Sequence, residues 1–133
     1  MVGVVIVSHS AKVAEGTKEI AEQMVGGELQ IIACGGDQKG GIGTDPDRIR
    51  AAISMADQGE GVVVLADLGS AVLSVGLILD SLPAKQKQRV QMADAPLVEG
   101  TVIAAVESAL GKNLRQVLAG AREAKFLEKT EDV

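Results

Sequence analysis

The stretch Val4-Val5-Ile6-Val7-Ser8-His9-Ser10 stands near the start of the chain and contains its only histidine. Four consecutive apolar residues, three of them valine, predict a short buried β-strand. His9 follows this run after a single serine. A lone histidine in a loop often has no chemical task, so both a plain loop residue and a reactive centre are open interpretations of His9.

The residues around His9 favour anion binding. Ser8 and Ser10 place hydroxyl groups on both sides of the imidazole, and a helical pattern begins at Ala11. His9 would therefore stand just before a helix N-terminus, where free backbone N–H groups attract anions, phosphate included. Ser10 is accordingly a candidate phosphate ligand.

Apolar runs alternate with helical patterns along the rest of the chain. The first helix is predicted to end at Gly26-Gly27, and Asp45-Pro46 predicts the cap and first-turn proline of the second. Helical spacing predicts the apolar faces of these two helices: Val13, Thr17, Ile20 and Met24, then Ile49, Ala52, Ile53 and Ala56. The predicted strands are Val2–Val7, Leu29–Ala33, Val62–Leu65 and Val90–Met92, and the later helices are Ser70–Leu82, Pro96–Leu110 and Asn113–Lys125.

Strands that alternate with helices predict an α/β fold, a doubly wound, flavodoxin-like, four-stranded and mainly parallel sheet with helices on both faces. The expected strand order is 2-1-3-4, with the topological switch point between strands one and three. The loops that leave these two strands carry His9 and Asp67. Ligands in such sheets bind at the carboxyl ends of the strands, so the topology alone predicts that the histidine and the carboxylate lie together.

The length of 133 residues fits one domain, predicted over residues 1–127, with residues 128–133 as a frayed tail. The glycine-rich segment Cys34–Thr44 predicts a long surface loop. This loop could be simply mobile, or it could help to dock a partner, and both interpretations are open.

Composition excludes several function classes. The net charge is −5 with both signs interspersed, and Phe is the only aromatic type present, which argues against nucleic-acid and polybasic membrane partners. One Cys and one His predict neither a disulfide framework nor a metal site. No leader pattern and no apolar run near about 20 residues is found, so a cytoplasmic protein is expected.

A carboxylate that faces an imidazole has a definite chemical use. It accepts a hydrogen bond from one ring nitrogen and leaves the other, Nε2 of His9, free to act as a nucleophile. Asp67 could instead be a cap for the helix that begins near Ser70, and Ser70 could also be only a cap. Gly69 and Ser70 would offer backbone N–H groups and a hydroxyl to a phosphoryl group on the ring.

Four motifs of the chain occur in the order found in one known family. They are Val5–Ser10, Ile42–Asp45, Asp67–Ala71 and Ala95–Thr101. Over nearly its whole length the chain resembles the DhaM family, the phosphotransferase subunits of the phosphoenolpyruvate-dependent dihydroxyacetone kinase, whose domain is of the mannose-type EIIA class. Four motifs in the same order are far more specific than any one of them.

The resemblance implies a phosphocarrier with a phosphohistidine intermediate. The carrier protein HPr would phosphorylate His9, and the group would pass to ADP held with magnesium in the nucleotide-binding subunit of the kinase, so no cofactor is expected on this chain. His9 matches the family's phosphorylated histidine, Asp67 the acidic residue that hydrogen-bonds its ring, and Ser70 the serine that contacts phosphate. Some members carry HPr-like and enzyme I-like domains on the same chain, which are expected here on separate proteins.

Two other functions are compatible with the sequence. A mannose-type EIIA for sugar uptake would pass the phosphoryl group to a transporter subunit, and a phosphorylation-controlled regulatory module would turn over no substrate. A homodimer is expected in each case, because the predicted helix Ser70–Leu82 has apolar residues on nearly all sides and needs a second surface to cover it.

Overall fold

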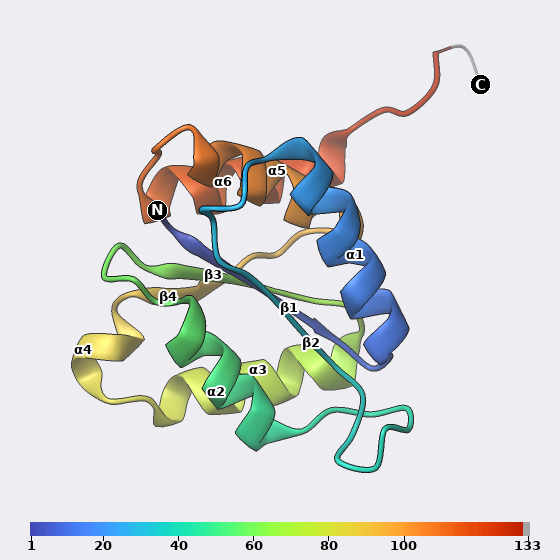
Figure 1. The fold of residues 1–133 in the computed structure, drawn as a ribbon, viewed down its shortest axis with the longest axis vertical. Coiled ribbons are helices and arrows are strands. Elements are labelled where there is room, and N and C mark those ends of the chain that lie inside the picture. Colours follow the sequence, from blue (N-terminus) through green and yellow to red (C-terminus); the bar gives the residue numbers. More distant parts are fainter. Residues whose placement is uncertain (132–133) are drawn as a thin grey trace.

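A four-stranded sheet runs through the middle of the molecule in the computed structural model, which describes residues 1–131 (Figure 1). All neighbouring strands are parallel, and the order is β2-β1-β3-β4, which confirms the predicted fold class and strand order. The strands are β1 Gly3–Ser8, β2 Ile31–Gly35, β3 Val62–Ala66 and β4 Val90–Met92.

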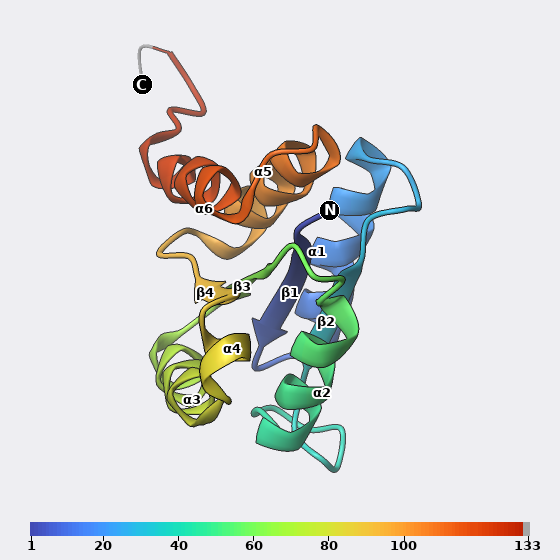
Figure 2. The ribbon, with the colours of Figure 1, turned by 90° about the vertical axis from the view of Figure 1, so that its left-hand side faces the viewer.

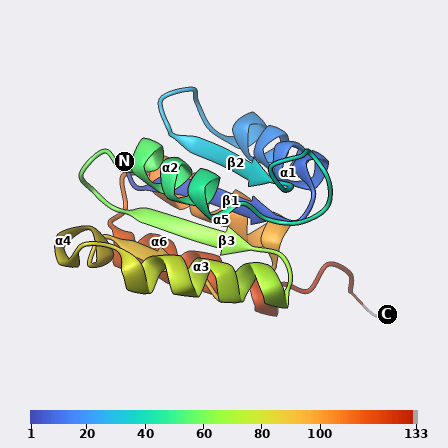
Figure 3. The ribbon, with the colours of Figure 1, turned by 90° about the horizontal axis from the view of Figure 1, so that it is seen from below.

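Helices cover both faces of the sheet, because successive side chains of each strand point to opposite faces. Val4 and Ile6 of β1 pack with α1, α5 and α6, and Val5 and Val7 pack with α2 and α3 (Figures 1 and 3). The helices are α1 Ala11–Met24, α2 Pro46–Ala56, α3 Gly69–Ser81, α4 Ala84–Lys87, α5 Leu97–Ala109 and α6 Leu114–Glu123, followed by the 3-10 turn η1 Ala124–Phe126.

Strand β2 lies two residues later than the sequence predicts. Cys34 and Gly35, which were predicted to begin the loop, pair with Val7 and Ser8 of β1 instead. An added Cβ on Gly35 would lie 2.4 Å from the backbone oxygen of Ser10. Glycine is therefore needed here because the end of β2 touches the backbone at the start of α1, an approach that turn propensity does not predict.

The buried face of α1 also differs from the predicted one. The residues that face the interior are Ala14, Thr17 and Ala21, whereas Val13, Ile20 and Met24 are 45%, 51% and 60% exposed. Small residues face inward because α1 lies close against the sheet and α5, and of the predicted face only Thr17 is buried. The predicted apolar face of α2 is correct, since Ile49, Ala52, Ile53 and Ala56 are all buried.

The remaining elements end within about two residues of their predicted positions. The predicted break after Pro83 contains a single short helix, α4, that the sequence did not indicate. Asn113 and Gln116 form a capping box at the start of α6. Within the predicted tail, residues 128–131 form no helix or strand, and Lys129 pairs with Glu99 at 2.7 Å; residues 132–133 lie outside the described part of the chain.

Gly3 provides a test of how tightly α2 packs on the sheet. A Cβ on Gly3 would lie 2.2 Å from the backbone oxygen of Ala56, so Gly3→Ala must push α2 away from β1. We expect a loss of about 1–3 kcal/mol in the free energy of unfolding, measured by urea denaturation.

The matched control is Gly16→Ala in α1, where an added Cβ meets nothing within 4 Å. Alanine is the better helix former by about 1 kcal/mol, so this variant should be as stable as the parent or more so. A Gly3→Ala protein with unchanged stability would show that the contact between β1 and α2 can relax.

Candidate functional site

The carboxyl ends of β1 and β3 are held side by side by their pairing. Val7 lies opposite Ala66, and the N–H of Asp67 donates to the carbonyl of Val7 at 3.2 Å. Parallel strands in this register place the residues that follow each strand next to each other. The first turns of α1 and α3 therefore lie at the same end of the sheet, at the lower right of Figure 1.

The Asp67 carboxylate accepts four hydrogen bonds. Oδ2 accepts from Ser8 Oγ at 2.8 Å and from the His9 backbone N–H at 3.0 Å. Oδ1 accepts from the Leu68 backbone N–H at 2.7 Å and contacts His9 Nδ1 at 2.8 Å. A carboxylate has about four acceptor sites. All of them are used here, so the orientation of the group is fixed.

The imidazole of His9 lies between this carboxylate and a hydroxyl. Its second nitrogen, Nε2, is 2.5 Å from Ser70 Oγ. Because a carboxylate can only accept, Nδ1 carries the proton and donates to Asp67, which leaves a lone pair on Nε2 that accepts from the Ser70 hydroxyl. The side chains of His9 and Asp67 are 20% and 17% exposed, so the pair is mostly shielded from solvent but still accessible to it.

The charge state of Asp67 follows from these contacts. Burial raises the pKa of the Asp67 carboxyl, but hydrogen bonds from Ser8, His9 and Leu68 outweigh it, and the net result is a pKa below the ordinary value. The group is therefore a carboxylate over the whole neutral range. It stabilises a positive charge on the ring and keeps the proton of the neutral ring on Nδ1.

Helix α3 begins beside His9 without a capping side chain. Leu68 is its N-cap residue and makes no side-chain cap hydrogen bond, and Asp67, one residue earlier, contacts the start of the helix through the N–H of Leu68. Ser70 lies in the first turn, and its hydroxyl contacts His9. Gly69 and Ser70 are exposed at a helix N-terminus, which is the position in which backbone N–H groups bind anions.

Ser10 has a structural contact in addition to its predicted role. Ser10 is the N-cap residue of α1, and its Oγ accepts from the N–H of Val13 at 3.3 Å. Phosphate binding by Ser10, Gly69 and Ser70 stays a prediction, and of these three residues the structure brings only the Ser70 side chain into hydrogen-bonding contact with the imidazole.

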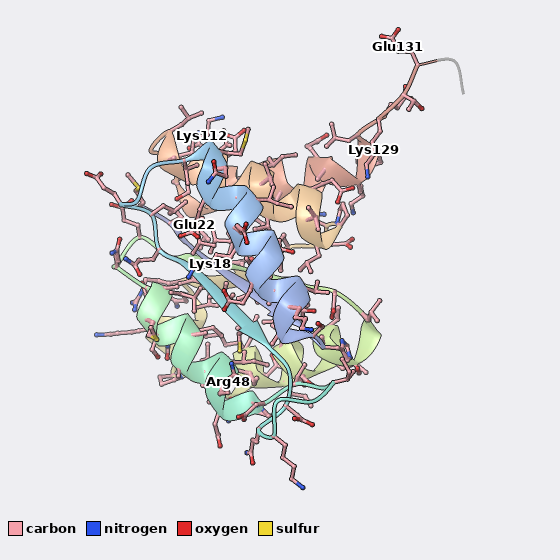
Figure 4. The ribbon with its side chains drawn as sticks, turned by 45° about the vertical axis from the view of Figure 1, so that its right-hand side comes forward. Lys18, Glu22, Arg48, Lys112, Lys129 and Glu131 are labelled. Carbon is pink, nitrogen blue, oxygen red and sulfur yellow. The ribbon has the colours of Figure 1, made fainter. Side chains whose placement is uncertain are left out.

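The glycine-rich loop between β2 and α2 is tied to the site. The N–H of Gly43 donates to the carbonyl of His9 at 2.9 Å, and Asp37 Oδ1 accepts from the N–H groups of Lys39 and Gly41. Arg48, labelled in Figure 4 on α2, donates to the carbonyl of Gly35 at 3.2 Å. The contact of Gly43 holds the loop against the backbone of His9, and the contacts of Asp37 lie within the loop itself.

A cavity of about 300 Å³ opens beside the carboxylate, lined by Ala66, Asp67, Val72, Met92, Ala93, Asp94 and Ala95. Among residues 1–131, no group of three or more His, Cys, Asp or Glu side chains is arranged to hold a metal ion. None of the helices in that range is long and apolar enough to cross a membrane.

Sequence reasoning underestimated Ser8. The sequence places its hydroxyl next to His9, but Ser8 is fully buried and its Oγ contacts Asp67 rather than the solvent-facing side of the ring. The contribution of Gly43 was missed as well. Both contacts depend on the pairing of β1 with its neighbours, for which adjacency in the sequence gives no signal.

Comparison with known proteins identifies relatives of this chain. Residues 3–118 match the family EIIA-man, described as the PTS system fructose IIA component. The phosphoryl donor subunit DhaM of a phosphoenolpyruvate-dependent dihydroxyacetone kinase from Klebsiella michiganensis is 41% identical, over 93% of this chain and 27% of the relative. The corresponding subunit of dihydroxyacetone kinase 2 from Listeria innocua is 36% identical, over 89% of this chain and 94% of the relative.

Two solved structures share the fold. A crystal structure of a protein of unknown function aligns with a TM-score of 0.83 and 39% identity, covering 92% of this chain and 93% of that one. A sigma-54 interaction domain protein from Enterococcus faecalis aligns with a TM-score of 0.69 at 12% identity, over 94% of this chain and 90% of that one, and shows the fold alone. On the family match and the identities with these subunits, the chain belongs to the mannose-type EIIA family and, within it, to the group of the DhaM phosphoryl donor subunits.

Proposed function

We propose that this protein is a cytoplasmic phosphocarrier whose His9 accepts a phosphoryl group from HPr and passes it to ADP bound in the nucleotide-binding subunit of a dihydroxyacetone kinase. The observation that carries the proposal is the imidazole held between Asp67 Oδ1 at 2.8 Å and Ser70 Oγ at 2.5 Å, with Nε2 on the side away from the carboxylate. The relatives are phosphoryl donor subunits of kinases that depend on phosphoenolpyruvate, which supports the same reaction.

The proposed step is a nucleophilic displacement at phosphorus. The lone pair of Nε2 attacks the phosphoryl group, the bond between phosphorus and the donor's nitrogen breaks, and its electron pair returns to that nitrogen. The ring becomes positively charged as the new bond forms, and the Asp67 carboxylate stabilises this charge through Nδ1–H. Ser70 Oγ gives up its hydrogen bond to Nε2 and can donate to a phosphoryl oxygen instead.

The second transfer reverses the chemistry of the first. An oxygen of ADP attacks phosphorus, the bond to Nε2 breaks, and the electron pair returns to the imidazole. Phosphoryl transfer needs positioning and charge neutralisation, which ADP-bound magnesium on the partner would supply. HPr and the kinase subunit have to reach the same nitrogen, so they would dock in turn on the surface around His9 and form small, transient contacts.

We also propose a homodimer formed through α3. The inward residues of this helix are Ala71, Val75 and Ile78, but large apolar side chains remain on its outer side. Val72, Leu73 and Leu77 are 40%, 70% and 73% exposed, and α3 lies along one edge of the molecule in Figure 3. An exposed row of apolar residues on one helix is typical of a protein interface, and a two-fold dimer would cover it on both copies.

Phosphorylation of His9 is the first test. After incubation with enzyme I, HPr and ³²P-labelled phosphoenolpyruvate, we expect one acid-labile label per chain in the parent protein and none in His9→Ala, because His9 is the only imidazole. Label that persists in the variant would place the reaction on another residue.

The acceptor is tested with the isolated phosphorylated protein. The label should move to ADP when the nucleotide-binding subunit of the kinase, ADP and magnesium are added. Transfer only to a sugar-transporter subunit would favour the sugar-uptake function. A label that no acceptor removes would favour the regulatory module.

Asp67→Asn tests the role of the carboxylate in both activity and stability. An amide no longer restricts the ring proton to Nδ1, so the rate of phosphoryl acceptance should fall about 100-fold or more. Asp94→Asn is the matched control, because Asp94 lines the same cavity but pairs with Lys125 at 2.9 Å. Equal rates in the parent and Asp67→Asn would assign the carboxylate a purely structural role.

The stability of the same variant should respond to pH in a defined direction. The folded-state pKa of Asp67 is depressed, so its contribution to stability is present above the unfolded value of about 3.9 and is lost as pH falls through the folded value. Between neutral pH and acid, the free energy of unfolding of Asp67→Asn should therefore fall less than that of the parent, measured by urea denaturation at each pH.

The dimer is tested by Leu73→Glu, which places a charge on the exposed side of α3. We expect the parent protein to sediment as a dimer at micromolar concentration and the variant as a monomer, since burying an unpaired carboxylate is costly. Leu110→Glu, at a residue 70% exposed just after α5, should leave the dimer intact. A monomeric parent would refute the proposed interface.

A further inference from the structure

The hydroxyl of Ser8 is fully buried at the end of β1 and makes two hydrogen bonds. Its Oγ donates to Asp67 Oδ2 at 2.8 Å and accepts from the N–H of Ser10 at 3.1 Å. We propose that Ser8 is a positioning residue, which fixes the Asp67 carboxylate and the His9 backbone relative to each other so that Nδ1 meets Oδ1 and Nε2 points outward. Neither of these contacts is to the reacting nitrogen.

The backbone on both sides of the His9 side chain is fixed by hydrogen bonds. The N–H of His9 itself donates to Asp67 Oδ2 at 3.0 Å, while the N–H of the next residue, Ser10, donates to Ser8 Oγ. Three consecutive residues are thus connected to one carboxylate, either directly or through a single hydroxyl. The backbone that carries the imidazole cannot shift relative to Asp67 without breaking one of these bonds.

The same contacts determine which carboxylate oxygen faces the ring. Oδ2 is held by Ser8 and the His9 N–H, and Oδ1 is left for Leu68 and the imidazole. Without the Ser8 hydroxyl, Oδ2 keeps a single donor and the carboxylate can rotate. Ser8 is 0% exposed, so bulk solvent does not replace the lost donor in the folded protein. A buried acceptor that loses its partner is unfavourable, and the carboxylate would move to recover one.

A second buried serine, Ser108, lies near the start of β1 and has no contact with Asp67. Ser108 of α5 is also 0% exposed, and its Oγ donates to the carbonyl of Val2 at 2.5 Å. Ser108→Ala therefore removes the same hydroxyl group from an equally buried position, far from Asp67 along β1. It is the matched control for a loss of stability without a change at the site.

The first experiment observes the site directly, with no phosphoryl donor present. Carboxyl ¹³C NMR should show the pKa of Asp67 rising toward its ordinary value in Ser8→Ala, and ¹⁵N spectra should show a weakened hydrogen bond at His9 Nδ1. The titratable groups that face Asp67 are His9 and, across the cavity, Asp94. Both remain in every variant compared. Unchanged signals in Ser8→Ala, or equal changes in Ser108→Ala, would overturn the proposal.

The second experiment measures the rate of phosphoryl acceptance by His9. The expected change in this rate rests on the proposed function. Ser8→Ala should lower kcat about 10- to 100-fold, because small displacements of a reacting group have effects of this size. The KM for the donor should not change, since a fully buried side chain cannot contact HPr. Ser8→Thr, which keeps the hydroxyl, should restore the NMR signals and most of the rate.

The outcomes separate the two proposals. If the parent protein accepts no phosphoryl group, the proposed function fails, while the NMR comparison still decides the role of Ser8. If the parent protein is phosphorylated but Ser8→Ala has normal kcat, or changes only KM, the positioning role is wrong.

Discussion

The parallel pairing of β1 with β3 is the interaction on which the site depends. Val7 lies opposite Ala66, so Ser8 at the end of β1 and His9 just after it lie beside Asp67, which follows β3. His9 and Asp67 are nevertheless almost sixty positions apart in the sequence. The pairing lies in the middle of the sheet, between β2 and β4, and both strands are buried on both faces (Figure 2). A shift of one residue in this register would separate the imidazole from the carboxylate, and the core packing on both faces opposes such a shift.

Around this pairing, hydrogen bonds hold the neighbours of the imidazole in place. Asp67 uses all its acceptor capacity on Ser8, His9 and Leu68, and the loop that contains Gly43 binds the carbonyl of His9. The exposed partner of the ring is a single hydroxyl, on Ser70. Such an arrangement suits the proposed reaction at Nε2, because that reaction would need little reorganisation of the groups around the ring.

Close approaches between backbones complete the arrangement. Gly35 lets the end of β2 touch the start of α1, and small residues such as Ala14 and Ala21 let α1 lie against the sheet. The consequence on α1 is that its larger apolar side chains remain on the surface, and α3 also keeps large apolar side chains exposed. On α3 they include Leu73 and Leu77, which supports the proposed contact with a second copy of the chain.

The sequence alone determined the fold class, the strand order and the two principal residues of the site. Unbroken apolar strands and intervening helices predict a parallel sheet, whose common strand order has its switch point between β1 and β3. One histidine and one carboxylate follow those two strands directly. Tertiary structure alone decided the inward face of α1, the extension of β2 through Gly35, and the contacts of Ser8 with Asp67 and Ser10. All three features depend on distances between backbones and on strand register. A residue's identity and its neighbours in the sequence specify neither of these two quantities.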